Sequence, residues 1–464
     1  MPLHGGANSL YDLVVVGGGA AGFSAAVAGA EAGARVLLVS NGPLGGTCVN
    51  FGCVPTKRML HVLAEARRRG ERVKLVELLR DARSVSERLR KAKYEDLLGE
   101  LGVDYVRGRA RFLGPGRLEV GGVEYRFRAA VVAVGAKTWR PPIEGLREAE
   151  AAGRVLDNET LMELGDEPES VVVVGGRAQG IEFSQIMARA GVRVTLLQRS
   201  PRLLPNAEPE ASAELESILV GDGVDVRKGV RVRRVLLVGG RVRVEVSQGG
   251  ATSQIEADYI FLATGRRPHL EGLGLENVGV KVTEQGFIDV DETLKASEGI
   301  YAAGDCIGEP MLEPVAAREG YVAALNALGR GPIRMDYSVV PRAVFTDPEY
   351  ASVGLTEREL ARRLGVCACR VVRLRELPKA AILGEERGFI KMVVDPRDRR
   401  IVGVHMVGRS ASEVIHEAAL AIKAGMTVDD IIDAIHVFPT MSEALKYAAL
   451  SFYRDVRKMP CCLL

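Results

Sequence analysis

The stretch YDLVVVGGGAAGFSAAVAGAEAGARVLLVS, residues 11–40, decides the fold. It predicts an apolar strand, a glycine-rich turn, a helix of small residues and a second strand, which together form one βαβ unit. Gly17, Gly19 and Gly22 have the spacing G-x-G-x-x-G, and their missing side chains would let a pyrophosphate reach the amides of a helix N-terminus. Dinucleotide sites usually place an acidic residue after the second strand, whereas this chain has Ser40. We therefore expect a dinucleotide site whose adenosine contact differs from the usual one.

A second unit, SVVVVGGRAQGIEFSQIMARAGVRVTLLQRS over residues 170–200, repeats this layout. Gly175 and Gly180 keep the outer glycines of the turn, but Arg177 replaces the middle one. An arginine there would crowd a pyrophosphate unless its guanidinium turns to meet it. The pattern predicts a second dinucleotide site with a modified turn.

The residues after the second strand of that unit bear on the choice of nucleotide. Gln198 stands where an acid would bind a ribose hydroxyl, and Arg199 and Arg202 follow it. Two guanidinium groups suit a 2′-phosphate, so we expect NADPH, with NADH still possible. The alternative is that both arginines form a solvated rim.

Composition and charge exclude several classes of protein. The chain of 464 residues has 62 Lys and Arg against 60 Asp and Glu, so no net basic field indicates a nucleic acid or an anionic membrane as partner. It contains no apolar run of about 18 residues that could span a bilayer, and MPLHGGANSL at its start lacks the apolar core of a signal peptide. We therefore expect a soluble, cytoplasmic protein.

The order of the predicted elements indicates an α/β fold with two Rossmann-like domains and a third domain of strands and amphipathic helices. WRPPIEG, which contains Pro141 and Pro142, predicts a linker, and YIFLATGRRP near Thr264 is expected to return the chain to the first domain. The expected segments are 1–148 for the first domain, 149–257 for the second, 258–330 for the return to the first, and 331–464 for the third.

GTCVNFGCVPTK, residues 46–57, contains two of the seven cysteines, which are too few for a disulfide framework in a chain of this length. Cys48 and Cys53 follow the first βαβ unit, and the segment from Cys53 onward predicts a helix. A helix N-terminus and the ammonium of Lys57 both favour a thiolate. Two such thiols near a dinucleotide can cycle between disulfide and dithiol. A zinc site would need two further ligands, which the six histidines do not supply nearby.

Four stretches in chain order carry a family resemblance: the turn at Gly17, GGTCVNFGCVPTK, ATGRRP with YAAGDC, and HVFPTMSEALKYAA. Together they resemble the FAD-dependent pyridine nucleotide–disulfide oxidoreductases along the whole chain. The resemblance implies that the third domain is an α+β dimerisation domain and that the protein is a homodimer whose subunits share their active sites. The residues implied for FAD are Gly17, Gly19, Gly22, Gly46, Thr47, Gly135 and Asp305, and those implied for the nicotinamide nucleotide are Gly175, Gly180, Arg199 and Arg202.

The resemblance also assigns roles to the two thiols. It implies that Cys48 exchanges with the substrate and that Cys53 lies against the flavin. It further implies that Lys57 pairs with Glu182 close to the flavin N5. A buried lysine beside a flavin needs a carboxylate partner, which agrees with that pairing.

The last of the four motifs departs from the disulfide reductases of this family. Those enzymes have a histidine immediately before the proline of H-P-T-x-x-E, where it acts as acid and base for the substrate thiol and is oriented by the glutamate. This chain keeps Glu443 as a catalytic candidate but has Phe438 in place of the histidine. His436 lies two positions earlier, and on a strand that shift would move it a full pleat away.

The end of the chain, FYRDVRKMPCCLL, has two adjacent cysteines, Cys461 and Cys462. Adjacent thiols suit a soft, two-coordinate cation. Together with the missing histidine, this ending resembles the mercuric reductase branch of the family, which implies NADPH-dependent reduction of Hg(II) to Hg(0). The implied route takes Hg(II) from a thiol complex to Cys461 and Cys462 of the partner subunit, and then to Cys48 and Cys53. The alternative for the two terminal cysteines is an inert end.

Two other functions stay open at this stage. One is a disulfide reductase of the same family, similar to dihydrolipoamide dehydrogenase or thioredoxin reductase. The other is a flavoprotein that binds soft metals through its thiols without turning them over. An intact GTCVNFGCVPTK with Lys57 and Glu182 favours an enzyme, because metal binding alone would not need a flavin-coupled thiol pair.

The remaining cysteines have simpler interpretations. Cys367 and Cys369 alternate on a predicted strand and would share one face of it, where we expect them to pack, since no acidic residue or histidine neighbours them. Cys306 follows Asp305, and we expect it to be buried and inert.

Overall fold

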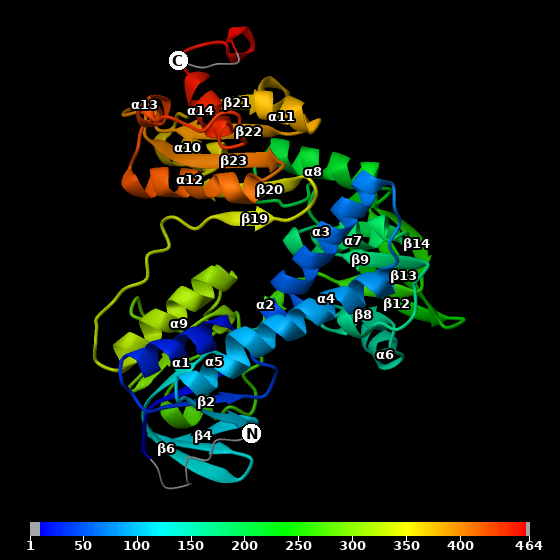
Figure 1. Ribbon diagram of the computed structural model, residues 1–464. Helices are drawn as coiled ribbons and strands as arrows, with labels where there is room; N and C mark the ends of the chain where they lie inside the picture. The colour runs from blue at the N-terminus through cyan, green and yellow to red at the C-terminus, as the bar shows by residue number, and fades with distance from the viewer. Residues whose placement is uncertain (1–9, 461–464) are drawn as a thin grey trace.

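The computed structural model describes residues 10–460, so Cys461 and Cys462 lie outside the described residues. Three domains are visible, each built on its own main sheet (Figure 1). Two have parallel, Rossmann-like sheets and the third is α+β, which confirms the predicted fold class. No helix among the described residues is long and apolar enough to cross a membrane.

The first domain has a sheet whose central strands run parallel and whose β1 and β2 are the two strands of the first βαβ unit. Its strand order is β17 (Lys295–Ser297), β18 (Ile300–Ala302), β6 (Val123–Val132), β1 (Leu10–Val16), β2 (Val36–Ser40) and β3 (Asp104–Arg107). An antiparallel hairpin, β4 (Ala110–Gly114) and β5 (Arg117–Val120), extends from β6. The helices are α1 (Ala20–Glu31), α2 (Gly46–Phe51), α3 (Cys53–Arg69), α4 (Leu75–Arg90), α5 (Asp96–Glu100) and α9 (Glu313–Ala327).

The second domain has a fully parallel sheet beside a smaller antiparallel one. The parallel order is β11 (Asp225–Lys228), β10 (Arg193–Gln198), β9 (Ser170–Val174), β15 (Tyr259–Leu262) and β8 (Val155–Leu156). The smaller sheet contains β12 (Arg231–Val238), β13 (Arg241–Gln248) and β14 (Ala251–Ala257). The helices are α6 (Leu146–Ala151), α7 (Ala178–Arg189) and α8 (Pro209–Gly221).

One strand changes the expected division of the chain. β15 was expected to open the return to the first domain at residue 258, but it pairs with β9 inside the second sheet. Its apolar residues Ile260, Phe261 and Leu262 are completely buried there, which is the environment that a continuous apolar strand needs. We therefore propose that the return begins after Leu262, where β16 (Arg266–Arg267) pairs with β7 (Lys137–Thr138).

The third domain has an antiparallel sheet covered by helices (Figure 1). Its strand order is β19 (Arg342–Val344), β20 (Glu349–Gly354), β23 (Ile401–Gly408), β22 (Phe389–Val394) and β21 (Ala368–Arg373). The helices are α10 (Glu357–Leu364), α11 (Pro378–Leu383), α12 (Ala411–Ala424), α13 (Val428–Asp433) and α14 (Glu443–Leu450).

A continuous apolar cluster joins the three domains. It contains Met59 from α3, Ile181 and Phe183 from α7, and Val344 and Tyr350 from the start of the third domain. All five side chains are buried. Because burial of apolar area stabilises a contact in proportion to that area, this cluster holds the three domains against one another.

The two helices α1 and α9 pack unusually closely in the first domain. A Cβ atom added to Gly320 of α9 would lie 1.9 Å from the carbonyl oxygen of Ala21 in α1. Glycine is required at this position because the helix backbones touch there. The alanine-rich sequence of α1 also allows the two helices to come close, because its side chains are small.

We predict that Gly320→Ala lowers the thermal denaturation midpoint, because an added methyl in a tightly packed contact costs about 1–3 kcal/mol. Gly99→Ala is the matched control, since Gly99 is also helical and an added Cβ there meets nothing within 4 Å. Circular dichroism of both variants measures the midpoints. Equal midpoints for the two variants would show that the α1–α9 contact is looser than described.

Candidate active site

The two glycine-rich turns are built in the same way. A Cβ added to Gly22 would lie 1.8 Å from the oxygen of Gly17, and one added to Gly180 would lie 1.7 Å from the oxygen of Gly175. In both units the glycine pair therefore lets the first turn of the helix pack directly on the end of the preceding strand. The structure thus places these four predicted glycines in two equivalent turns.

The glycine-rich turn that begins at Gly17 has the features of an anion-binding site. Gly19 is the N-cap of α1, and neither a side-chain cap nor an acidic residue occupies the first turn of that helix. The N-terminal amides of α1 are therefore not satisfied by capping side chains, and such amides favour a phosphate. A Cβ added to Gly46 would lie 2.7 Å from Cα of Gly19, so only glycine allows the start of α2 to touch the turn. This geometry fits the pyrophosphate of FAD.

Arg266 links the other residues that sequence analysis predicted for FAD. Its Nε donates to Asp305 Oδ2 at 3.2 Å, and its Nη2 donates to Thr47 Oγ1 at 3.2 Å and also to the oxygen of Ala136. Burial raises the pKa of Asp305, while Arg266 opposes that shift. Gly135 immediately precedes Ala136, and a Cβ added to it meets nothing within 4 Å. Sequence analysis missed Arg266, although it lies within the quoted ATGRRP motif.

The second turn accommodates Arg177 without strain. Arg177 is the N-cap of α7 with φ −98° and ψ −175°, close to the φ −80° and ψ −170° of Gly19 in α1. Gln198 is buried, and its Oε1 accepts a hydrogen bond from the amide of Gly176 at 3.0 Å. Gln198, at the position usually held by an acidic residue, therefore stabilises the glycine-rich turn.

The two arginines predicted for a 2′-phosphate have different surroundings. Arg199 is exposed, directly after β10. Arg202 is half-buried, and its Nη2 donates to the oxygen of Pro205 at 3.1 Å. Both lie on the segment that follows the parallel strand, at the edge of the sheet where this fold class binds its nucleotide.

Cys48 and Cys53 lie on two consecutive helices. Cys48 belongs to the short α2, and Cys53 is the first residue of α3, as predicted. Both cysteines are free. The neighbouring Cys48 thiol lowers the pKa of Cys53, with a further contribution from the Lys57 ammonium, and the Cys53 thiol raises the pKa of Cys48. Cys53 is therefore the member of the pair that deprotonates first.

Lys57 and Glu182 form the ion pair that sequence analysis predicted. Lys57 Nζ lies 2.8 Å from Glu182 Oε2, and Glu182 Oε1 accepts the amide of Phe345 at 2.9 Å. The ring of Phe345 lies under the ammonium, 4.5 Å from Nζ to the ring centre. Burial opposes the charge on Lys57, but Glu182 and the two thiols outweigh it and raise the pKa of Lys57. The ammonium therefore stays charged beside the thiol pair.

The motif around Phe438 differs from the expectation of a strand. Residues 434–440 form no strand, and His436 bonds through Nε2 to Glu417 Oε1 at 2.8 Å. Glu443 is buried, and its Oε2 accepts the amide of Thr440 at 3.0 Å. The glutamate that would orient a histidine therefore holds the backbone of its own loop.

Cys306 is completely buried, as predicted, and its thiol donates to the oxygen of Ala303 at 3.3 Å. Burial raises the pKa of Cys306 to about 12. This thiol stays protonated at neutral pH, which agrees with the expected inert role.

We predict that iodoacetamide alkylates Cys53 of the reduced, FAD-loaded protein at a lower pH than it alkylates a free thiol. The thiolate is the form that reacts, and the lowered pKa of Cys53 means that this form is already present at a lower pH. Cys48→Ala should shift the alkylation profile to higher pH, since it removes the largest cause of the depression. Lys57→Met should shift it in the same direction by less. Peptide mass spectrometry of Cys53 against pH measures all three profiles, and unchanged profiles in both variants would refute the assignment.

Comparison with known proteins gives a consistent result. Residues 11–320 match the family model of the pyridine nucleotide-disulphide oxidoreductases, and residues 340–449 match the dimerisation domain of that family. Mercuric reductase from Lysinibacillus sphaericus is 36% identical over 465 residues, covering 97% of this chain and 84% of the relative. Dihydrolipoyl dehydrogenase from Thermus scotoductus is 38% identical over 463 residues, covering 96% of this chain and 98% of the relative.

A solved structure resembles the whole chain. The HOCl-induced flavoprotein disulfide reductase RclA from Escherichia coli has a TM-score of 0.87 at 29% identity, covering 96% of this chain and 100% of its own. Fold, motifs and relatives agree along the chain. This protein belongs to the pyridine nucleotide-disulphide oxidoreductases, a family of enzymes that use FAD and NAD(P)H.

Proposed function

We propose that this protein is an NADPH-dependent mercuric reductase, which reduces Hg(II) to Hg(0) through FAD and the Cys48/Cys53 pair. The observation that carries the proposal is the apolar side chain of Phe438 at the position where disulfide reductases of the family need an acid and base. A disulfide substrate needs a proton delivered to its leaving sulfur, whereas a metal ion bound by thiolates does not. Similarity to mercuric reductases over nearly the whole chain supports the same activity.

The titratable side chains of this motif already have hydrogen-bond partners. His436 is bonded to Glu417 and to the oxygen of Ala434, and Glu443 accepts the amide of Thr440. Neither side chain is therefore placed as a substitute for the absent histidine. In this proposal Glu443 acts as a positioning residue that fixes the loop carrying Phe438.

We assign the cofactors to the two glycine turns. Gly17, Gly19, Gly22, Gly46 and Thr47 would hold FAD, together with Gly135 and Asp305. Gly175, Gly180, Arg199 and Arg202 would hold NADPH at the second turn. Bound FAD and NADPH would supply the two electrons that reduction of Hg(II) consumes.

The thiol pair is suited to bind Hg(II) between its two sulfurs. Its Cys53 thiolate is favoured by the neighbouring Cys48 thiol and by Lys57, both of which lower the pKa of Cys53. Hg(II) then replaces the remaining proton on Cys48, and that proton passes to solvent. Two electrons convert the bound Hg(II) into Hg(0), which has little affinity for thiolate and leaves.

Delivery of the metal would involve a second subunit. The end of the described chain lies on the outer part of the third domain, whereas α2 lies near the junction of the domains (Figure 1). Cys461 and Cys462 of the partner subunit, which lie outside the described residues, would therefore serve this Cys48/Cys53 pair. The dimerisation-domain match and the exposed apolar side chains of Ile435 (99%) and Val437 (77%) support a homodimer. We place this enzyme in the cytoplasm.

We predict stoichiometric, Hg(II)-dependent oxidation of NADPH by the FAD-loaded enzyme under anaerobic conditions with HgCl2 in excess thiol, together with release of volatile mercury. Cys461→Ala/Cys462→Ala should slow turnover about tenfold or more, because a tethered thiol pair raises the local concentration of metal. Leu463→Ala/Leu464→Ala is the matched control, since it changes two residues of the same end of the chain and keeps both cysteines.

Two results would contradict the proposal in different ways. Oxidation of NADPH driven by oxidised glutathione, lipoamide or thioredoxin, with Hg(II) only inhibiting, would identify a disulfide reductase with an unusual base. Tight binding of Hg(II) without oxidation of NADPH would identify a metal-binding flavoprotein that does not turn over.

A further inference from the structure

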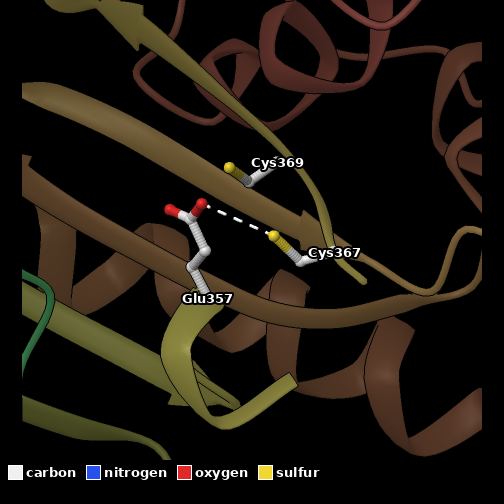
Figure 2. A group of neighbouring side chains, drawn as sticks. All are labelled: Glu357, Cys367 and Cys369. Carbon is white, nitrogen blue, oxygen red and sulfur yellow. Dashed lines mark hydrogen bonds between the residues drawn. The ribbon is translucent and has the colours of Figure 1, made fainter. Parts of the chain in front are cut away.

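Cys367 and Cys369 have an acidic neighbour that their local sequence does not reveal. The Cys367 thiol donates a hydrogen bond to Glu357 Oε1 at 3.5 Å, and the Cys369 sulfur lies within 4.8 Å of a Glu357 oxygen. Figure 2 shows the three side chains turned toward one another from α10 and from the start of β21. The expectation that these thiols only pack, without an acidic neighbour, was wrong, because folding brings α10 beside β21.

The backbone holds the three side chains in place. Cys369 lies in β21 and Cys367 immediately precedes that strand, and the two sulfurs and one Glu357 oxygen all lie within 4.8 Å of one another. Glu357 is the first residue of α10, whose start is fixed by a capping box between Thr356 and Glu359. Two of the three groups, Glu357 and Cys369, therefore lie on regular elements, and Cys367 is adjacent to one of them.

The spacing of the ligand atoms suits a metal ion. One sulfur from each cysteine and one oxygen of Glu357 all lie within 4.8 Å of one another. A cation that bonds each sulfur at about 2.3 Å can join two sulfurs that are up to about 4.6 Å apart. The two sulfurs therefore need to move only slightly to bind one cation together. Two thiolates with one carboxylate select zinc-like and softer cations over Mg²⁺ or Ca²⁺, which prefer oxygen.

Lys391 fixes the orientation of the carboxylate. Its ammonium is buried and bonds to Glu357 Oε2 at 2.7 Å, to Glu208 Oε2 at 2.9 Å and to Glu210 Oε1 at 2.9 Å. This cation already occupies the space between the three carboxylates, so they are not an open metal site themselves. Oε1 of Glu357 is left facing the thiols, and the excess of carboxylates over ammonium favours an added cation there.

We propose that Glu357, Cys367 and Cys369 form a second metal site, separate from the Cys48/Cys53 pair, for one zinc-like divalent cation. The ion replaces the two thiol protons: two S–H bonds break, two metal–sulfur bonds form, both protons pass to solvent and no electron is transferred. The exchange leaves the net charge beside buried Lys391 unchanged. Glu357 supplies the third ligand, and an open position remains for water or an exogenous thiol.

The experiment uses Zn(II) and the FAD-loaded protein carrying Cys48→Ser/Cys53→Ser and Cys461→Ser/Cys462→Ser, which removes the other candidate ligands. We expect this background variant to keep one Zn(II) per chain after gel filtration, measured by elemental analysis. We also expect one proton released per thiol on titration in weak buffer.

Adding Cys367→Ser/Cys369→Ser to the background should abolish zinc retention and proton release. Glu357→Gln should weaken binding by about tenfold or more, since it removes the charged ligand but keeps the shape of the side chain. Equal FAD content and denaturation midpoints in all variants control for folding. A background variant that retains no zinc, or retains it equally without Cys367 and Cys369, overturns the site. Neither outcome depends on whether the enzyme reduces Hg(II).

Discussion

The carboxylate of Glu182 is the point on which the arrangement of the three domains depends. It lies on α7 of the second domain, binds the ammonium of Lys57 from α3 at 2.8 Å and accepts the amide of Phe345 from the third domain at 2.9 Å. Glu182 is buried and Lys57 is half-buried, so removing the lysine would leave a buried carboxylate without its cation, which is unfavourable. The apolar cluster around Phe183 excludes water from the same junction. The ion pair that sets the charge beside the thiols is therefore also the contact that positions the domains.

A buried ammonium organises the junction of the second and third domains. Lys391 on β22 bonds to Glu208 and Glu210 at the start of α8 and to Glu357 at the start of α10. Its side chain is 1% exposed, so the charge persists only because three carboxylates surround it. Burial opposes its charge, but these carboxylates raise the pKa of Lys391. Each junction thus contains one lysine that binds at least one acid of another domain, and both lysines lie next to a cysteine pair.

Sequence patterns predicted the features whose determinants are local. The glycine spacing and the apolar strands of each βαβ unit lie within one short segment, so they indicate the turn without knowledge of the rest of the fold. The pairing of Lys57 with Glu182 joins residues 125 positions apart, and only the family resemblance suggested it. The role of Arg266 and the approach of Glu357 to Cys367 depend on tertiary packing and could not be derived locally. The placement of β15 was missed because a short apolar strand fits either sheet until its neighbours are known.

The two cysteine pairs show how neighbouring charge decides what a dithiol can do. Cys53 stands at a helix N-terminus near an ammonium, and the lowered pKa of its thiol favours the nucleophilic thiolate. Cys369 faces a carboxylate, and burial together with that carboxylate raises its pKa to about 12. A thiolate available without a metal suits exchange and electron transfer, in which ligands must bind and release. Thiols that are deprotonated only when a metal binds are suited to retaining that metal, because the metal supplies the positive charge that stabilises the two thiolates.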